Sequence, residues 1–86
     1  MEILQIHSTH GGAFFIEQDG ERIAELTYRK INNDIIDANH TFVSPSLRGQ
    51  GVADKLYQAL LHFVEQKGYR LEASCSYVAT KLARRK

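Results

Sequence analysis

The stretch that decides the fold is residues 40–56, HTFVSPSLRGQGVADKL, where the hydrophobic pattern changes its period. Up to Val43, residues alternate with a period of two, which is typical of a strand with two different faces. From Val52 onward, apolar residues recur with a period of about 3.6 and predict an amphipathic helix. Pro45 cannot donate to a sheet ladder, so we expect the strand to end close to it. A strand, a short loop and a helix are therefore predicted in this order.

The strand before the loop is expected to cover Ile35–Val43 and to present two faces. One face is expected to carry Ile36, Ala38, His40 and Phe42, and the other Ile35, Asp37, Asn39, Thr41 and Val43. The helix after the loop has one apolar stripe, which contains Val52, Leu56, Ala59, Leu60, Phe63 and Val64. Gly68 is well placed to end that helix in a left-handed conformation.

Turn signals divide the N-terminal half into antiparallel strands. Asp19-Gly20 predicts a two-residue hairpin, because both positions tolerate positive φ. An Asn-Asn-Asp sequence at residues 32–34 supplies a second turn. The predicted strands are Ala13–Gln18 and Arg22–Arg29, and a short strand at Ile3–His7 could precede them.

The C-terminal part predicts one more strand and one more helix. Tyr69–Ser74 has the alternation of a short strand, and Ser76 could cap a last helix that buries Val78 and Leu82. The strands on either side of the long helix should run parallel, as in a βαβ unit. The fold class is therefore α+β, with the order β-β-β-β-α-β-α and a mixed, mostly antiparallel sheet.

Length and composition narrow the classes of protein. The 86 residues predict a single domain over residues 1–86. The contents of 43% hydrophobic and 24% charged residues are ordinary for a globular chain and argue against disorder. The 11 basic and 10 acidic residues give a net charge of +1, which argues against a general nucleic-acid binder.

The single cysteine and the apolar pattern suggest a compartment. Cys75 has no second cysteine to pair with, which excludes an internal disulfide and fits a reducing cytoplasm. The N-terminus lacks the basic start and the apolar run of a signal peptide. No apolar stretch approaches the roughly 20 residues that cross a bilayer, so no membrane association is expected.

Four cations, Lys81, Arg84, Arg85 and Lys86, crowd the C-terminus. They could complement the dipole in the last turn of a helix, which is the more common role of such residues. Alternatively, they could help to hold phosphates. The sequence leaves both interpretations open.

The loop between strand and helix has the composition of an anion-binding turn. Gly49 and Gly51 allow a tight turn and a close approach of the backbone to a ligand. The amides of Arg48–Ala53 are expected to point out of the first turn of the helix, where a pyrophosphate could bind. The loop lacks the Gly-Lys-Ser/Thr of a P-loop, and Asp54 stands where a dinucleotide fingerprint needs a third glycine. Spacing alone leaves open a plain connection in which glycine only relieves strain.

At this point the sequence resembles a known family. Arg48-Gly49-Gln50-Gly51-Val52-Ala53 fits the Gln/Arg-x-x-Gly-x-Gly/Ala signature of the GNAT N-acetyltransferase superfamily. The combination of His40-Thr41-Phe42-Val43, this loop and Cys75-Ser76-Tyr77-Val78 is similar to very short, single-domain YjdJ-type GNAT-like proteins. The resemblance covers most of the chain from about Phe14 and implies a minimal GNAT-like fold that binds acetyl-coenzyme A (acetyl-CoA) as a cosubstrate.

The resemblance also implies how the ligand would lie. The strand before the loop would separate from its parallel neighbour, and backbone groups of Phe42 and Val43 would pair with the pantetheine arm. The pyrophosphate would be held by Arg48, Gly49, Gln50, Gly51, Val52 and Ala53. Larger members of the superfamily have N-terminal helices that shape the acceptor site, and this chain departs from them because it has no room for such helices.

Three residues are candidates for catalysis. Cys75 could act as a nucleophile before a helix N-terminus, which lowers the pKa of a thiol, with His40 as the base. The resemblance adds weight to both, because they match positions implicated in the short proteins. Tyr77 could protonate the sulfur of CoA, as a tyrosine beyond this strand does in many members. Free cysteine is also often a small buried hydrophobe, and a lone histidine is often structural. The other histidines and Cys75 do not have the spacing of metal ligands, so no metal site is expected.

The main functional hypothesis is an N-acetyltransferase that moves acetyl from CoA to an amine, either a small molecule or a protein lysine. The alternative is a non-catalytic acyl-CoA-binding or sensor module on a shortened scaffold. We expect a monomer or a weak homodimer formed through exposed sheet edges. A nucleic-acid-binding role for the basic C-terminus is weak at a net charge of +1.

Overall fold

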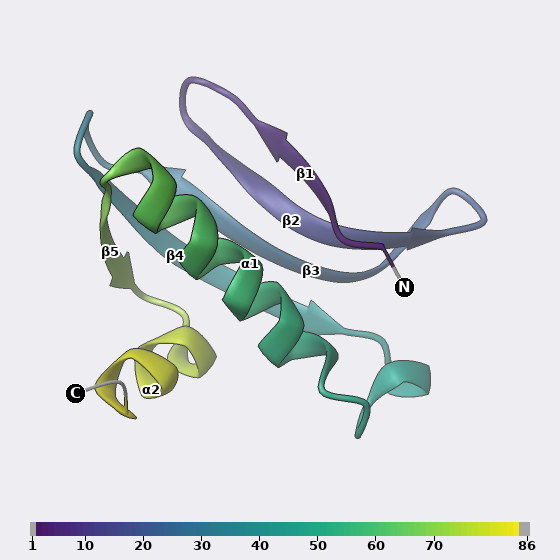
Figure 1. The fold of residues 1–86 in the computed structure, drawn as a ribbon. Coiled ribbons are helices and arrows are strands. Elements are labelled where there is room, and N and C mark those ends of the chain that lie inside the picture. Colours follow the sequence, from purple (N-terminus) through teal and green to yellow (C-terminus); the bar gives the residue numbers. More distant parts are fainter. Residues whose placement is uncertain (1, 85–86) are drawn as a thin grey trace.

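The computed structural model describes residues 2–84 and contains one five-stranded sheet in the order β1-β2-β3-β4-β5 (Figure 1). Two members of the C-terminal basic cluster, Arg85 and Lys86, lie outside the described residues. The elements are β1 (Leu4–His7), β2 (Gly11–Gln18), β3 (Glu21–Lys30), β4 (Ile35–Val43), the 3-10 turn η1 (Pro45–Leu47), α1 (Val52–Lys67), β5 (Arg70–Ala73) and α2 (Ser76–Arg84). This order confirms the α+β class and the predicted β-β-β-β-α-β-α arrangement. No described helix has both the length and the apolar content to cross a membrane.

The turns form where the sequence predicts them. Asp19 and Gly20 have φ values of 55° and 79°, the left-handed pair that a tight hairpin between β2 and β3 requires. The Asn32 side-chain oxygen accepts hydrogen bonds from the amides of Asp34 and Ile35, at 2.8 and 3.0 Å, and closes the turn before β4. The first four strands are therefore antiparallel, and only β4 and β5 run parallel.

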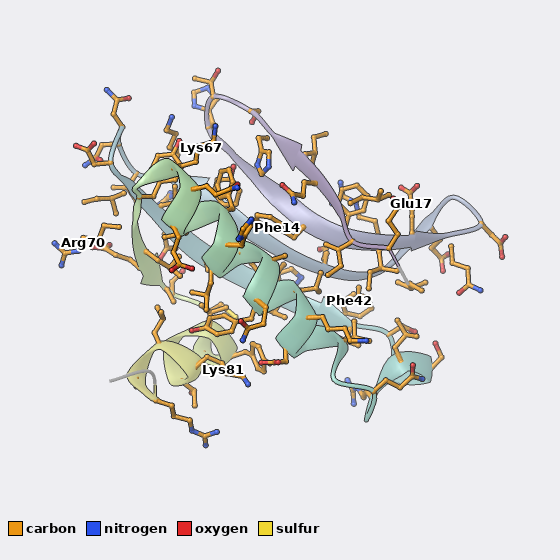
Figure 2. All side chains as sticks on the ribbon, in the orientation of Figure 1. Phe14, Glu17, Phe42, Lys67, Arg70 and Lys81 are labelled. Carbon is orange, nitrogen blue, oxygen red and sulfur yellow. The ribbon has the colours of Figure 1, made fainter. Side chains whose placement is uncertain are left out.

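Helix α1 lies across one face of the sheet and covers β2, β3 and β4 (Figure 1). Its apolar stripe buries Leu56 and Leu60 completely against Phe14, Leu26 and Ile36 of the sheet. Each such side chain contributes about 1.5–3 kcal/mol on burial. Figure 2 shows Phe14 beneath the helix, whereas Lys67 and Arg70 lie at the far end of the molecule from the η1 turn.

Gly68 ends α1 as predicted. Its φ of 72° is left-handed, and its amide donates to the carbonyl of Val64. Glycine adopts this conformation without the steric cost of a Cβ atom, so the chain can turn directly into β5.

A β-bulge in β4 changes the predicted faces of this strand. Thr27 of β3 pairs with His40, but the neighbouring Tyr28 pairs with Ala38, so Asn39 is an extra residue. Beyond the bulge, Thr41 and Val43 lie opposite the buried Leu26 and Ala24, respectively, and take the face that α1 covers. The prediction that His40 and Phe42 share a face with Ile36 and Ala38 is therefore wrong. They lie on the outer face of the sheet, with Glu25 and Thr27.

Strands β4 and β5 separate soon after they meet. Their parallel pairing covers only Ile35–Ala38 of β4, opposite Arg70–Ala73 of β5. The carbonyl of Ala38 then accepts from the amides of both Ser74 and Cys75, at 3.1 and 3.0 Å, and the chain turns into α2. The remainder of β4 continues without β5 beside it, which leaves a gap between the end of β4 and the start of α2.

Candidate functional site

The turn between η1 and α1 has the backbone of an anion site. Gly49 and Gly51 have left-handed φ values of 83° and 72°, and Gly51 is the N-cap residue of α1. A Cβ atom at either glycine would meet no atom within 4 Å, so the conformation, rather than crowding, requires glycine here. No side chain of the described residues caps this N-terminus, so its first amides are directed outward.

The structure narrows the predicted set of outward amides. The Arg48 amide donates to Pro45 and the Gln50 amide to Leu47, each at 3.3 Å, within and just after η1. The first helical bond of α1 runs from the Lys55 amide to the Gly51 carbonyl. The Arg48 and Gln50 amides are therefore occupied, which leaves those of Gly49, Gly51 and the first turn from Val52 onward to face an anion at the positive end of the helix dipole.

A hollow of about 240 Å³ opens at this turn. Its walls come from the end of β4, the turn, the start of α1 and α2. The lining residues are Val43, Leu47, Arg48, Gly49, Gly51, Val52, Ala53, Asp54 and Tyr77. Six of the predicted ligand residues, namely Val43, Arg48, Gly49, Gly51, Val52 and Ala53, thus line one hollow, whereas Gln50 and Phe42 are not among the lining residues.

The free edge of β4 offers backbone groups to an extended ligand. The Ser44 amide donates to the Ile23 carbonyl of β3 at 2.8 Å. Because backbone groups alternate in direction along a strand, those of Thr41 and Val43 point to the opposite side, into the gap left by β5. By the same alternation Phe42 faces β3. The backbone groups that face an extended arm are therefore those of Thr41 and Val43, of which the Thr41 amide also hydrogen-bonds to the Cys75 thiol.

Cys75 lies at the gap, on the N-cap position of α2. Its carbonyl accepts a hydrogen bond from the Ala79 amide at 2.9 Å, which is the first helical bond of α2. The sequence predicted Ser76 as the cap, whereas the structure places the cap one residue earlier, at Cys75. Its Sγ lies 3.3 Å from Oγ1 of Thr41 across the gap. Burial raises the pKa of the thiol. Hydrogen bonds from the Thr41 hydroxyl and from the amides of Val78 and Tyr77 lower it, and the net pKa lies below its ordinary value.

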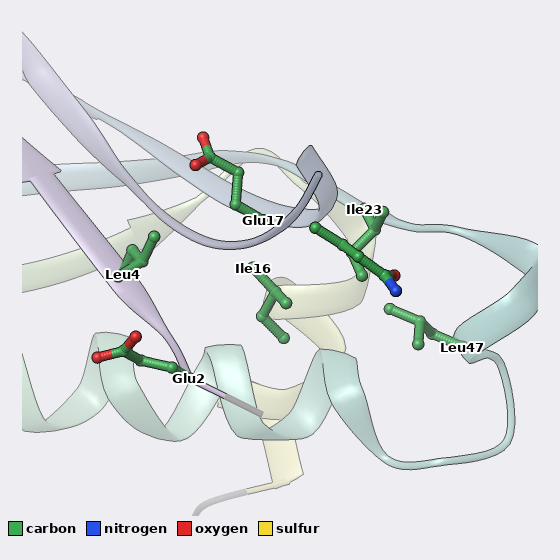
Figure 3. Close-up of a pocket in the computed structure, with 7 residues that line it drawn as sticks. Glu2, Leu4, Ile16, Glu17, Ile23 and Leu47 are labelled. Carbon is green, nitrogen blue, oxygen red and sulfur yellow. The ribbon is translucent and has the colours of Figure 1, made fainter. Parts of the chain in front are cut away.

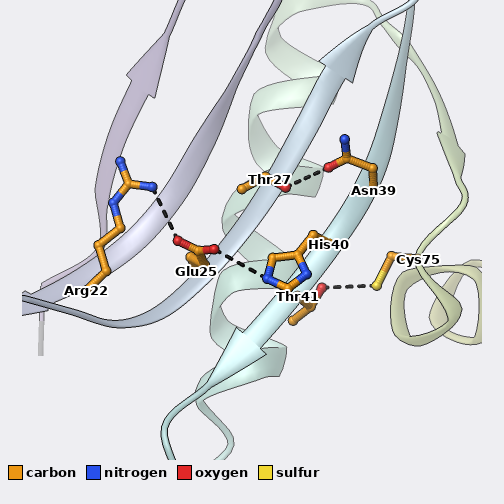
Figure 4. A network of polar contacts seen from close by, with 7 residues as sticks. All are labelled: Arg22, Glu25, Thr27, Asn39, His40, Thr41 and Cys75. Atoms are coloured by element: carbon orange, nitrogen blue, oxygen red, sulfur yellow. Dashed lines mark hydrogen bonds and ion pairs between the residues drawn. The ribbon is translucent and has the colours of Figure 1, made fainter.

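His40 lies in a polar chain on the outer face of the sheet (Figure 4). Its Nε2 lies 3.3 Å from Oε2 of Glu25, whose Oε1 is in turn 3.3 Å from the Arg22 guanidinium. The imidazole is about half exposed, so a molecule in solvent can reach it. Cys75 instead contacts Thr41, whose side chain lies on the covered face of the sheet. The two predicted catalytic side chains thus meet β4 from different sides.

Tyr77 and Phe42 complete the set predicted from the sequence. Tyr77 lies in the first turn of α2, and its ring is 5.7 Å from Nζ of Lys81. Phe42 is 42% exposed on the outer face, next to His40 in register along β4 (Figure 2). The predicted roles of both residues therefore rest on their positions in the fold.

A larger hollow of about 460 Å³ lies on the other side of Leu47 (Figure 3). Leu4, Ile16 and Ile23 make its apolar wall, and Glu2 and Glu17 line it as well. It belongs to the β1 and β2–β3 end of the sheet rather than to the Cys75 gap. Within residues 2–84, no three His, Cys, Asp or Glu side chains are grouped so that they could hold a metal ion.

Sequence reasoning did not single out Thr41 or Asp54, and it named Lys81 only as one of four C-terminal cations that could complement the helix dipole or hold phosphates. The bulge at Asn39 brings Thr41 to Cys75, and the alternation of residues gives no sign of a bulge. The ion pair between Lys81 and Asp54, at 2.8 Å, joins residues 27 positions apart on two helices. Charge type alone could mark them as candidates, but only the packing of α2 beside the start of α1 pairs them.

Comparisons with known proteins identify the family. Residues 13–86 match the family model described as GCN5-related N-acetyl-transferase. Protein NATD1 of Mus musculus is 30% identical over 80 residues, which cover 79% of this chain and 73% of that protein. NATD1 of Bos taurus is 36% identical over 55 residues, which cover 64% of this chain. The matched residues cover 49% of the bovine protein, so the chain spans about half of its length.

Solved structures show the same fold. A GCN5-like protein from Staphylococcus aureus, determined by NMR, matches with a TM-score of 0.76 and 34% identity over 98% of this chain and 79% of that one. A GNAT family acetyltransferase from Elizabethkingia anophelis with acetyl-CoA bound matches with a TM-score of 0.67 over 90% of this chain and 53% of that one. At 16% identity, the second match concerns the fold alone. The fold and the match over residues 13–86 show that the chain belongs to the GCN5-related N-acetyltransferase family.

Proposed function

We propose that this protein transfers an acetyl group from acetyl-CoA to an amine by way of an acetyl thioester on Cys75. Membership of the family supports acetyl-CoA-dependent acetyl transfer in general. The observation that carries the specific route is the Cys75 thiol at the β4–α2 gap, with its pKa lowered by Thr41 and by the first amides of α2. A thiol in this state is a better nucleophile at neutral pH than an ordinary cysteine.

The ligand would bind along the turn and the gap. Arg48, Gly49, Gln50, Gly51, Val52 and Ala53 would surround the pyrophosphate, with the Val52 and Ala53 amides as direct donors. Backbone groups near Phe42 and Val43 would hold the pantetheine arm, and the alternation of β4 favours Thr41 and Val43 for this contact. This path brings the thioester from the helix N-terminus to the part of the gap that Cys75 borders.

In the first half-reaction, the Cys75 thiolate would attack the carbonyl carbon of the acetyl group. A new bond from carbon to Sγ would form, and the bond from carbon to the CoA sulfur would break with its electron pair on CoA. The departing thiolate would take a proton from the Tyr77 hydroxyl or from water. The products are S-acetyl-Cys75 and free CoA.

In the second half-reaction, the nitrogen of the acceptor would attack the same carbonyl carbon from the outer face. His40 would accept a proton from the amine, and the neighbouring Glu25 carboxylate would stabilise the imidazolium that results. The bond from carbon to Sγ would break, which returns Cys75 as a thiolate and releases the N-acetylated amine. His40 thus acts on the acceptor and needs no direct contact with Cys75.

The alternative function is a non-catalytic acyl-CoA-binding or sensor module. One observation favours it: residues 8–10 alone connect β1 to β2, and no helix there shapes an acceptor site. Both functions require the same ligand, so they differ only in whether the acetyl group leaves CoA. The acceptor, whether a small amine or a protein lysine, belongs to the enzyme hypothesis alone.

Two measurements test the proposal in sequence. Titration with acetyl-CoA should shift the amide NMR signals of residues 41–54, and unchanged signals at millimolar ligand would contradict both functions. Incubation with acetyl-CoA should then add one acetyl group to the intact mass, at Cys75, together with release of free thiol from CoA. Cys75→Ala should abolish this mass increase while it keeps the NMR shifts.

His40→Gln separates the two half-reactions. It should leave the acetylation of Cys75 largely intact and slow transfer to an added amine. Thr27→Val is a matched control on the same face, because the Thr27 hydroxyl bonds to Asn39 and takes no part in the His40–Glu25 ion pair. Binding of acetyl-CoA without any acetyl-Cys75 or acetylated amine would favour the binding module.

A further inference from the structure

We propose that the outer side of α2 holds the 3′-phosphorylated adenosine end of coenzyme A, with Lys81 and Arg84 as the partners of the 3′-phosphate. This inference rests on the proposed binding of acetyl-CoA and names a contact that selects CoA over ligands without the 3′-phosphate. It assigns a function to the described part of the C-terminal basic cluster.

A third hollow lies on α2, next to the hollow at the turn. It has a volume of about 390 Å³, within the range of small-molecule sites. Its lining residues are Ser76, Tyr77, Thr80, Lys81 and Arg84. Tyr77 also lines the hollow at the turn, so the two hollows share one wall.

The ion pair of Lys81 and Asp54 links the hollow at the turn to the hollow on α2. Asp54 is in the first turn of α1 and lines the turn hollow, whereas Lys81 lines the α2 hollow. Their charged groups are 2.8 Å apart, and both side chains are partly exposed. Figure 2 shows Lys81 on the side of α2 that faces the start of α1. A ligand held at the turn is therefore within reach of the Lys81 ammonium.

The shape of the ligand matches this arrangement. From the pyrophosphate, CoA extends in two directions, one to pantetheine and the other to the 3′-phosphorylated ribose and adenine. The gap beside β4 would take the first direction, and the α2 hollow, which shares Tyr77 with the turn hollow, would take the second. The hollow that shares Leu47 with the turn hollow is lined by Glu2 and Glu17, which do not suit a phosphate. The Tyr77 ring on the shared wall offers an apolar surface to a nucleoside.

The charges of the α2 hollow also suit a phosphate group. Among residues 2–84, its lining consists of two cations and of Ser76, Tyr77 and Thr80, which carry hydroxyls, and includes no carboxylate. A phosphate monoester carries between about −1.5 and −2 charges at neutral pH. Asp54 occupies one contact of the Lys81 ammonium, which has three donors, so Lys81 can bind a phosphate without the loss of this ion pair.

Helix-dipole stabilisation is the competing explanation for Lys81 and Arg84, which lie in the last turn of α2. This role would affect the stability of the helix and would not distinguish between ligands. A comparison of two ligands that differ only in the 3′-phosphate therefore separates the explanations.

The test is calorimetric titration of the unmodified protein with CoA and with 3′-dephospho-CoA. We expect 3′-dephospho-CoA to bind about tenfold more weakly, the size of one charge-assisted contact. Equal affinities would overturn this inference and leave the proposed function in place. Failure of both ligands to bind would overturn the proposed function and this inference with it. This comparison needs no variant.

Variants then identify the residues. In the double variant Lys81→Met, Arg84→Met, CoA should bind about tenfold more weakly and the two ligands should bind equally. Lys67→Met, at the opposite end of α1, removes a cation of the same type and should retain the discrimination. If the double variant still bound CoA more tightly than 3′-dephospho-CoA, the assignment of Lys81 and Arg84 to the 3′-phosphate would be wrong. The ³¹P NMR signal of the 3′-phosphate should shift on binding to the unmodified protein and stay unshifted with the double variant, whose fold circular dichroism would verify.

Discussion

At the scale of the residue, Cys75 shows how neighbours set the chemistry of a thiol. Burial raises its pKa, because a thiolate loses hydration when it is buried. Thr41 and the α2 amides lower its pKa, because they donate hydrogen bonds to the charged form. Burial is the largest single influence, but the hydrogen bonds together outweigh it, so the pKa of the thiol lies below its ordinary value. Thr41 can take part only because the bulge at Asn39 turns its side chain to the covered face.

Thr41→Val should raise the pKa of Cys75, because valine keeps the shape of the side chain but cannot donate a hydrogen bond. The rate of iodoacetamide alkylation, measured against pH, should show its midpoint move to higher pH. Thr27→Val is the control, since Thr27 lies on the outer face and bonds to Asn39. An unchanged alkylation profile in Thr41→Val would contradict the role given to this hydroxyl.

At the scale of the element, the start of α1 depends on a residue in a left-handed conformation. Gly51 combines an N-cap position with a φ of 72°. It also lines the turn hollow, and the space where its Cβ would lie contains no protein atom within 4 Å. The same glycine therefore lets α1 begin there and leaves room for a ligand at its N-terminus.

Gly51→Ala should cost about 1–2 kcal/mol of unfolding free energy, because a Cβ atom disfavours left-handed backbone. It should also weaken CoA binding, since the new methyl group enters the hollow. Gly20→Ala is a matched control in the β2–β3 hairpin, where φ is 79° and nothing lies within 4 Å. We expect urea unfolding to show similar losses for both, and calorimetry to show weaker CoA binding for Gly51→Ala only.

Strand β1 is fixed to the rest of the molecule through His7. Its imidazole stacks on Phe63 of α1 at 4.4 Å between centroids, and its Nδ1 lies 2.7 Å from the Tyr28 hydroxyl. Burial lowers the pKa of His7, and the positive charge of Lys67 lowers it further. The folded protein therefore favours neutral His7, which suits a ring packed between an aromatic side chain and a hydroxyl.

The lowered pKa of His7 predicts a pH dependence of stability. The unfolded chain takes up the proton at about pH 6.5, and the folded chain takes it up at a lower pH. The stabilisation is thus complete above about pH 6.5 and is lost as the pH falls through the folded pKa. Urea midpoints should fall more steeply with decreasing pH in the unmodified chain than in His7→Phe. The exposed His62, changed to Gln, should leave the slope unaltered; an equal slope in all three proteins would refute the prediction.

At the scale of the whole molecule, one helix on one sheet supplies most of the core. The stability expected of a chain of 86 residues is roughly 4–13 kcal/mol. Leu60 is fully buried between α1 and the sheet, so its truncation affects a large part of this total. The site shares this core, because Val52 and Val78 next to the turn and the gap belong to the same cluster.

Leu60→Ala should cost about 2–5 kcal/mol, because it leaves a cavity as well as losing apolar contact. Gln58→Ala, two residues earlier on the exposed side of α1, should change stability by less than about 0.5 kcal/mol. Chemical unfolding followed by circular dichroism measures both. A cost for Leu60→Ala as small as that for Gln58→Ala would mean that α1 does not supply the main core.

Local patterns were sufficient to predict the elements of this protein and the loop at its site. The hairpin at Asp19-Gly20, the end of β4 before Pro45 and the left-handed end of α1 at Gly68 each depend on the conformational preferences of one or two residues. The glycine-rich turn was predictable for the same reason. The residues of the turn lie close in sequence, so their proximity in space required no knowledge of the remaining fold.

Tertiary structure alone decided which side chains meet at the site. The bulge at Asn39 depends on pairing between β3 and β4, and it moves His40 and Phe42 to the outer face and Thr41 to Cys75. The packing of α2 beside α1 brings Lys81 to Asp54. The sequence by itself determined the order of elements and the glycine-rich turn, because these follow from the preferences of neighbouring residues. Register and helix packing depend on contacts between distant segments, which the spacing of residues along the chain does not specify.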